Sequence, residues 1–228
     1  MAQFNKQILG QAQGAVGDVT FRKRNGKTYL SAKPSSFTPG MDDKSVARRG
    51  KFSISIKLAS TINSIPVLKN IWEKNTPAEL STFNHIMRTN YAMIGSSSIT
   101  NALIKLTPAL GFNVNNPVVA LGPAAIKVNL DAIGTSAGID VLNEPSIKLV
   151  SVVYLGNPTD TTLKKDDFLT FTSDIQTTDL STALEFNKAL SDVEAQMFEI
   201  YQNRKGFFAV VTLDAAGEAV HYSNTFAG

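Results

Sequence analysis

The stretch SIKLVSVVYLG (residues 146–156) is one of five short runs after Pro108 that are rich in β-branched and aromatic residues. The other four are AAIKVNLDA (124–132), DFLTFTSDI (167–175), QMFEIYQN (196–203) and GFFAVVTLD (206–214). Turn-forming residues separate the runs, at Gly134, Gly138, Pro145, Asn157–Pro158, Asp166–Asp167, Gly206 and Gly217. Strands of this length and spacing predict an antiparallel β-sandwich of immunoglobulin-like size over residues 115–228.

One segment of this region fits two structures. The segment ALEFNKALSDVEAQMF (183–198) has apolar residues at helical spacing, and its end overlaps the strand predicted over residues 196–203. The sequence leaves open whether a helix crosses the sandwich here.

Helical patterns precede the predicted sandwich. Residues 42–64 place Phe52, Ile56 and Ala59 on one helical face, with Ile54, Leu58 and Ile62 beside it. Asp42 and Asp43 suit the positive N-terminal end of a helix. The alternation in KFSISIKL (51–58) is also typical of a strand, so both a helix and a strand remain open for this segment.

A second helix is predicted to begin at Thr76. Thr76 is the expected N-cap, Pro77 the first helical residue and Glu79 the partner in a capping box. Apolar residues follow at helical spacing, at Leu80, Phe83, Met87, Tyr91 and Ile94. We expect a short helix over residues 99–106 and expect Trp72 to pack between the helices.

Residues 18–33 predict a β-hairpin, because two strand-like runs flank Asn25–Gly26, a favoured two-residue turn. Strand alternation places Val19, Phe21 and Lys23 on one face, with Thr20, Arg22 and Arg24 on the other. The fold class is therefore α+β, in three parts. They are an extended arm with a β-hairpin (1–40), a helical region (41–107) and a sandwich domain (115–228).

The hairpin is the strongest candidate for a binding surface. It carries five basic residues within residues 10–34 and only one acidic residue, Asp18. The candidate protein-interaction residues are Phe21, Arg22, Lys23, Arg24, Lys27, Tyr29, Arg48 and Arg49. The glycines Gly10, Gly14 and Gly17 are candidates for turns and for close approach of a neighbouring backbone. Contact with protein, contact with nucleic acid and a solvated surface all remain open.

The charge of the chain is unevenly distributed. Residues 1–105 hold 15 Lys/Arg and 5 Asp/Glu, a balance of +10, whereas residues 106–228 hold 7 and 14, a balance of −7. Such a division indicates either two regions with different partners or mutual attraction between neighbouring copies.

Nothing in the sequence indicates an enzyme or a cofactor. There is no cysteine, and the two histidines, His85 and His221, are far apart in sequence. The motifs of zinc proteases, EF-hands, nucleoside triphosphatases and serine hydrolases do not occur. We interpret Asp42–Asp43 as stabilising a helix end and Asp166–Asp167 as a turn. We expect no catalytic residue, metal, cofactor or small-molecule substrate.

No apolar run is long enough for a signal peptide or a membrane-spanning helix. We therefore expect a protein that is made in the cytoplasm and does not contact membrane.

The N-terminal stretch resembles a signature found in phage and prophage proteins. That signature is a glycine-rich entry followed by G-x-V-x-F-R-x-x-x-G-K-x-Y and a proline-ended strand. The matching residues are Gly14, Gly17, Val19, Phe21, Arg22, Gly26, Lys27, Tyr29 and Pro34. The rest of the chain is similar to an uncharacterised family common in Bacteroidota and their phages, through FNHIMRTNY (83–91), VSVVYLGNP (150–158) and AVHYSNTF (219–226).

The resemblance implies a structural component of a phage virion, in the head, neck or tail, that assembles through its basic N-terminal arm. Its partners would be other virion proteins and copies of itself, with nucleic acid as a further candidate. The alternative function is a soluble module that binds nucleic acid or a host surface.

Overall fold

The computed structural model describes residues 2–4, 14–24, 26–33, 36 and 38–228. The chain divides into two compact units, Met1–Ser45 and Val46–Gly228. About 27% of the chain is helical and 37% is strand, and the sheets are antiparallel. The α+β class and the N-terminal hairpin are therefore confirmed.

The first unit is a four-stranded antiparallel sheet with the strand order β1-β4-β3-β2. Its strands are β1 (Ala2–Phe4), β2 (Gly14–Val16), β3 (Val19–Arg24) and β4 (Lys27–Ala32). We call it the N-terminal sheet. Gly17 (φ +55°) and Gly26 (φ +74°) lie in the two turns that join β2, β3 and β4, in a backbone conformation that favours glycine.

The second unit is built around two long neighbouring strands, β7 (Ser146–Pro158) and β11 (Tyr201–Leu213). They pair over most of their length, from Tyr201↔Pro158 to Leu213↔Ser146. The same sheet contains β8 (Asp166–Thr172), β9 (Gln176–Thr177), β12 (Ala219–Tyr222) and β13 (Phe226–Ala227). Residues 149–156 and 206–213 are all buried, so both faces of this central sheet are covered.

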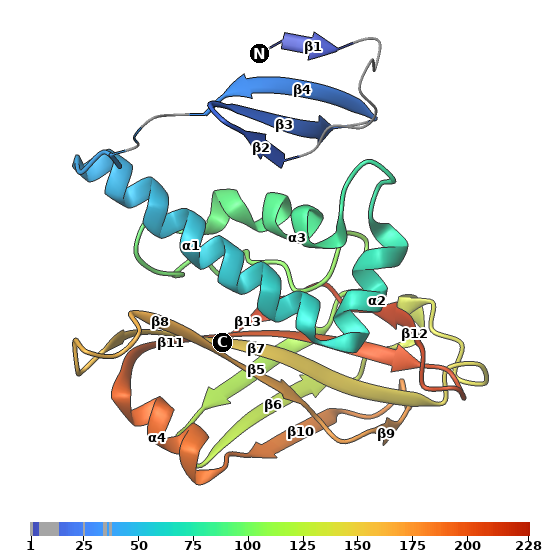
Figure 1. Cartoon of the computed structure of the whole chain (residues 1–228). Helices are drawn as coiled ribbons and strands as arrows, with labels where there is room; N and C mark the ends of the chain where they lie inside the picture. Colours follow the sequence, from blue (N-terminus) through green and yellow to red (C-terminus); the bar gives the residue numbers. More distant parts are fainter. Residues whose placement is uncertain (1, 5–13, 25, 34–35, 37) are drawn as a thin grey trace. The chain divides into compact units, whose positions relative to one another are not determined.

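Helices cover one face of the central sheet (Figure 1). They are α1 (Asp43–Ser64), α2 (Pro66–Asn75) and α3 (Thr82–Asn90), followed by the 3₁₀ turn η1 (Tyr91–Met93). Leu58, Ile62 and Trp72 pack with Val152 and Val211 of the sheet in one hydrophobic core. Of the two structures left open for residues 51–58, the helix is the one observed.

A second sheet covers the other face (Figure 1). Its strands are β5 (Asn115–Leu121), β6 (Ala125–Asp131) and β10 (Leu184–Ala189), in the order β10-β6-β5. The side chains of Val128 and Phe186 form a second core with Val153, Phe208 and Val210 of the central sheet. The 3₁₀ turn η2 (Thr135–Ala137) follows β6, and α4 (Asp192–Ile200) precedes β11.

The predicted N-cap at Thr76 is wrong. Thr76 instead ends α2, and its Oγ1 donates to the carbonyl of Trp72 (2.6 Å). Helix α2 does not continue through Pro77, because proline has no N–H to donate. A turn follows instead, in which the Leu80 N–H donates to the Pro77 carbonyl (3.0 Å). Ser81 caps α3 by accepting a hydrogen bond from the Asn84 N–H (3.3 Å).

Three further local predictions are also wrong. Residues 99–106 form no helix; they contain a turn at 102–103, and the buried Asn90 bonds both the N–H and the carbonyl of Lys105. The segment left open over residues 183–198 contains both structures: β10 covers 184–189, and α4 covers 192–200, where Ser191 and Glu194 form a capping box. The strand predicted over residues 196–203 therefore begins only at Tyr201. Asp166–Asp167 begins β8 and is not a turn.

The predicted division into residues 1–40, 41–107 and 115–228 stays a prediction. Within the described residues, no helix is both long and apolar enough to cross a membrane.

Candidate functional site

The predicted interaction residues of the hairpin lie on opposite faces of the N-terminal sheet. Phe21 pairs with Leu30, and Arg22 pairs with Tyr29 on the next position along. Because directly opposed residues share a face and successive residues alternate, Phe21 and Arg22 face opposite ways. Arg24 pairs with Lys27 beside the turn.

One face of the sheet is mainly apolar and the other is basic. The apolar face carries Val16, Val19, Phe21, Leu30 and Ala32, together with Lys23 and Thr28. The basic face carries Thr20, Arg22, Lys27, Tyr29 and Ser31. Val16 is 67% exposed, whereas Thr28 is buried. The candidate residues therefore form two surfaces, each with its own chemistry.

The remaining predicted residues lie apart from these two surfaces in the chain. Arg48 and Arg49 are exposed on α1, in the second unit. Gly10 lies outside the described residues. Gly14 (φ +104°) and Gly17 (φ +55°) adopt glycine-favouring backbone, and an added Cβ on either would have no neighbour within 4 Å. Gly17 lies in the turn before β3, whereas Gly14 lies in strand β2, opposite Phe21. Close approach of another backbone stays a prediction for both.

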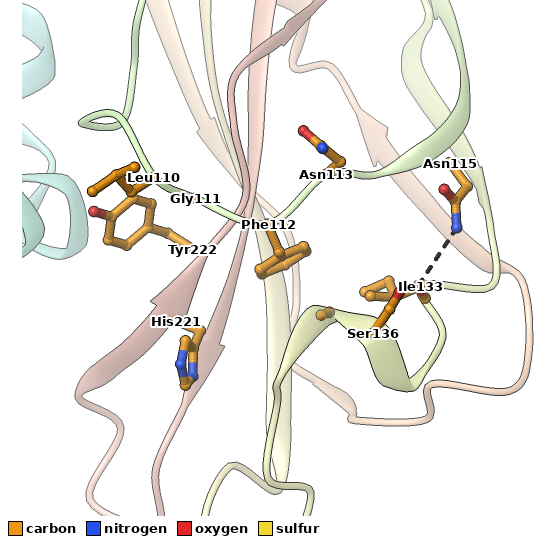
Figure 2. A pocket seen from close by; sticks show the side chains of 10 residues that line it. Leu110, Gly111, Phe112, Asn113, Asn115, Ile133, Ser136, His221 and Tyr222 are labelled. Atoms are coloured by element: carbon orange, nitrogen blue, oxygen red, sulfur yellow. Dashed lines mark hydrogen bonds between the residues drawn. The ribbon is translucent and has the colours of Figure 1, made fainter.

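The second unit contains a cavity of about 600 Å³ that the sequence does not indicate. Its walls come from the loop before β5, the segment around η2, and β12 (Figure 2). The lining residues are Leu110, Gly111, Phe112, Asn113, Asn115, Ile133, Ser136, Ala137, His221 and Tyr222.

His221 in this cavity is paired with a buried carboxylate. Its Nδ1 lies 2.9 Å from both oxygens of Glu144, a residue 77 positions earlier in the chain. The Thr212 hydroxyl and the Asp140 N–H also donate to Glu144. Burial raises the pKa of Glu144, but the hydrogen bonds from Thr212, Asp140 and His221 outweigh it and hold the pKa below its usual value.

The loop of residues 110–113, which forms another wall, is hydrogen-bonded to the sheet edge. Phe112 forms a parallel bridge with Ser223, with hydrogen bonds from the Phe112 N–H to Tyr222 O (3.0 Å) and from the Asn224 N–H to Phe112 O (2.7 Å). An added Cβ on Gly111 would lie 2.6 Å from the Ser223 backbone, so only glycine fits there. The preceding residue, Leu110, is 98% exposed and has a strained φ of +76°.

His85, the other histidine, has a structural role. Its Nδ1 lies 3.1 Å from Thr76 Oγ1, and its ring packs edge-on against Trp72. Within the described part of the chain, no three His, Cys, Asp or Glu side chains gather closely enough to hold a metal ion.

Comparison with models of known protein families found no match. Comparison with curated proteins found none either. The candidate sites therefore rest on their geometry alone.

Proposed function

We propose that this protein is a structural component of a phage virion that assembles with virion proteins and with copies of itself through its basic N-terminal sheet. The observation that carries the proposal is the sheet itself, which is a compact unit with a basic face and an apolar face. A two-faced sheet offers a partner both apolar area and charged hydrogen-bond donors.

The charge distribution supports contact between copies. The N-terminal 105 residues carry +10 and the remaining residues −7. Arg22 and Lys27 on the basic face complement acidic side chains exposed in the C-terminal half, such as Asp131 and Glu185. Electrostatic attraction of this kind favours the encounter and fixes the orientation of two copies.

We also propose that the central sheet and the β10-β6-β5 sheet of the second unit form an immunoglobulin-like sandwich. Their antiparallel order and shared core support it. The helices on the outer face of the central sheet add a layer that a two-sheet sandwich lacks.

The test is a double substitution on the basic face, Arg22→Glu with Lys27→Glu. Both side chains are exposed, so circular dichroism should show an unchanged fold. Quantitative mass spectrometry of purified virus particles should find the wild-type chain at fixed stoichiometry and the double variant strongly depleted. Lys188→Glu, an exposed lysine on β10, is the matched control and should incorporate normally.

Three results would contradict the proposal. The first is absence of the wild-type chain from purified particles, and the second is normal incorporation of the double variant. The third is salt-dependent DNA binding by the wild-type chain that the double substitution abolishes while incorporation is unchanged. That result would instead favour the nucleic-acid module.

A further inference from the structure

The cavity beside His221 has the properties of a small-molecule site. Its volume of about 600 Å³ lies within the range of roughly 300–1,000 Å³ that is usual for ligand pockets. In Figure 2, His221 and Tyr222 lie on one side, Ile133 and Ser136 on the other, and the ring of Phe112 between them.

The imidazole of His221 is held in a defined orientation for binding. Because Nδ1 lies 2.9 Å from both Glu144 oxygens, Nδ1 carries a proton and donates it to the carboxylate. Nε2 has no hydrogen-bond partner among the described residues, and the side chain is 46% exposed at the cavity. A histidine fixed through one nitrogen presents the other to a ligand without loss of ring freedom on binding.

The walls supply further ligand-binding groups. The Ser136 hydroxyl has no side-chain partner within the described part of the chain. The backbone of Phe112 is held by hydrogen bonds with Tyr222 and Asn224, and its ring packs against the second core. The Tyr222 hydroxyl donates to the Ala109 carbonyl (3.4 Å), which ties its ring to the same loop. Aromatic rings and polar groups thus line one cavity from three separate segments.

The charge of the lining decides the class of ligand. Neither lysine nor arginine lines the cavity, and the negative charge of Glu144 lies beside the only basic side chain, His221. An anionic ligand would therefore gain little Coulomb energy and would lie close to a carboxylate. A neutral ligand with several hydroxyl groups and an apolar ring face matches both the polar groups and the aromatic rings.

We propose that this cavity binds a neutral saccharide, with His221 Nε2 and the Ser136 hydroxyl bonding sugar hydroxyls and Phe112 and Tyr222 packing against the sugar ring. Glu144 acts as a positioning residue, because it touches His221 and not the ligand. This inference is independent of the assembly role of the N-terminal sheet.

The experiment is saturation-transfer NMR on the full chain with glucose, galactose, N-acetylglucosamine and glucuronate as probes. We expect transfer to at least one neutral sugar. We expect His221→Ala and Phe112→Ala to weaken that binding by about tenfold, the equivalent of one lost hydrogen bond or stacking contact. Ser136→Ala should weaken it a few-fold. His85→Ala and Ser97→Ala, which alter the same residue types away from the cavity, should bind like the wild type.

Circular dichroism of each variant distinguishes lost binding from lost folding. If Phe112→Ala fails to fold, Ser136→Ala and His221→Gln carry the test, since neither residue lies in the hydrophobic core. Absence of transfer to every neutral probe would overturn the proposal. Stronger binding of glucuronate than of glucose would also overturn it, as would unchanged binding by His221→Ala.

Discussion

Lys57 on α1 lies 2.5 Å from Asp166 on β8, so a salt bridge joins the helical layer to the central sheet across 109 positions of sequence. The two partners differ in exposure. The Lys57 side chain is 39% exposed, whereas that of Asp166 is 10% exposed. Lys57 Nζ also donates to the Asp166 carbonyl (3.1 Å), so the ammonium group serves two acceptors.

Removing Lys57 should therefore destabilise the protein more than removing Asp166. Lys57→Ala leaves a mostly buried carboxylate unpaired, at a cost of roughly 1–3 kcal/mol. Asp166→Asn leaves an ammonium group that can turn to water, and should cost about 1 kcal/mol or less. Urea denaturation of both variants measures the difference. Lys69→Ala, from the exposed pair with Glu73, is the control and should change little. A greater loss in Asp166→Asn would contradict this account.

The capping residues give a second prediction. Ser81→Ala and Ser191→Ala each remove the side-chain oxygen that accepts a free backbone N–H of α3 or α4, at a cost of about 1 kcal/mol. Replacing either serine by asparagine should be nearly silent, because asparagine caps equally well. Thermal melts of the four variants provide the test. Equal destabilisation by alanine and asparagine would show that the cap contacts do not contribute.

Acid should destabilise the protein through Glu144. Its folded-state pKa is lowered, so its contribution to stability is present above the unfolded-state pKa of about 4.3 and is lost as the pH falls through the lower folded value. Glu144→Gln removes this titration. Denaturation between neutral and acidic pH should show a steeper acid loss in the wild type than in the variant. Parallel pH profiles would rule out the assigned role of Glu144.

The strained backbone of Leu110 gives a fourth prediction. Leu110→Asn should raise the free energy of unfolding by roughly 0.5–1 kcal/mol, because asparagine tolerates positive φ and no buried apolar area is lost. Leu142, which is 92% exposed and not among the described positive-φ residues, is the matched control. Leu142→Asn should not stabilise. Denaturant titration measures the free energy of unfolding of both variants. An equal change in the two would show that relief of backbone strain does not stabilise Leu110→Asn.

Local composition was sufficient to predict parts of β6, β7, β8 and β11 and the N-terminal hairpin. SIKLVSVVYLG and GFFAVVTLD each form part of a strand, and Gly26 takes the positive φ that an Asn-Gly turn requires. Helix boundaries were harder to predict, because Thr76–Pro77 has the composition of a helix start but follows directly on α2. The exposed positions of Phe52 and Ile56 on α1 were not foreseen either, since helical spacing does not say which face meets the sheet.

The His221–Glu144 pair could not be predicted from the sequence. Glu144 lies in the loop before β7 and His221 on β12, and neither has a local motif around it. Only the pairing of β12 with β11, and the bond from the Thr212 hydroxyl to Glu144, bring the two together. Contacts of this kind depend on tertiary structure and leave no periodic signal.

The pairing of β7 with β11 has a consequence for folding kinetics. Strand β11 contributes Phe207, Ala209 and Val211 to one core and Phe208 and Val210 to the other. Neither core can be completed before β11 is in place, and β11 begins only at Tyr201, late in the chain. Until β11 inserts, β7 is an exposed apolar edge, so a high contact order predicts slow folding and an intermediate prone to aggregation.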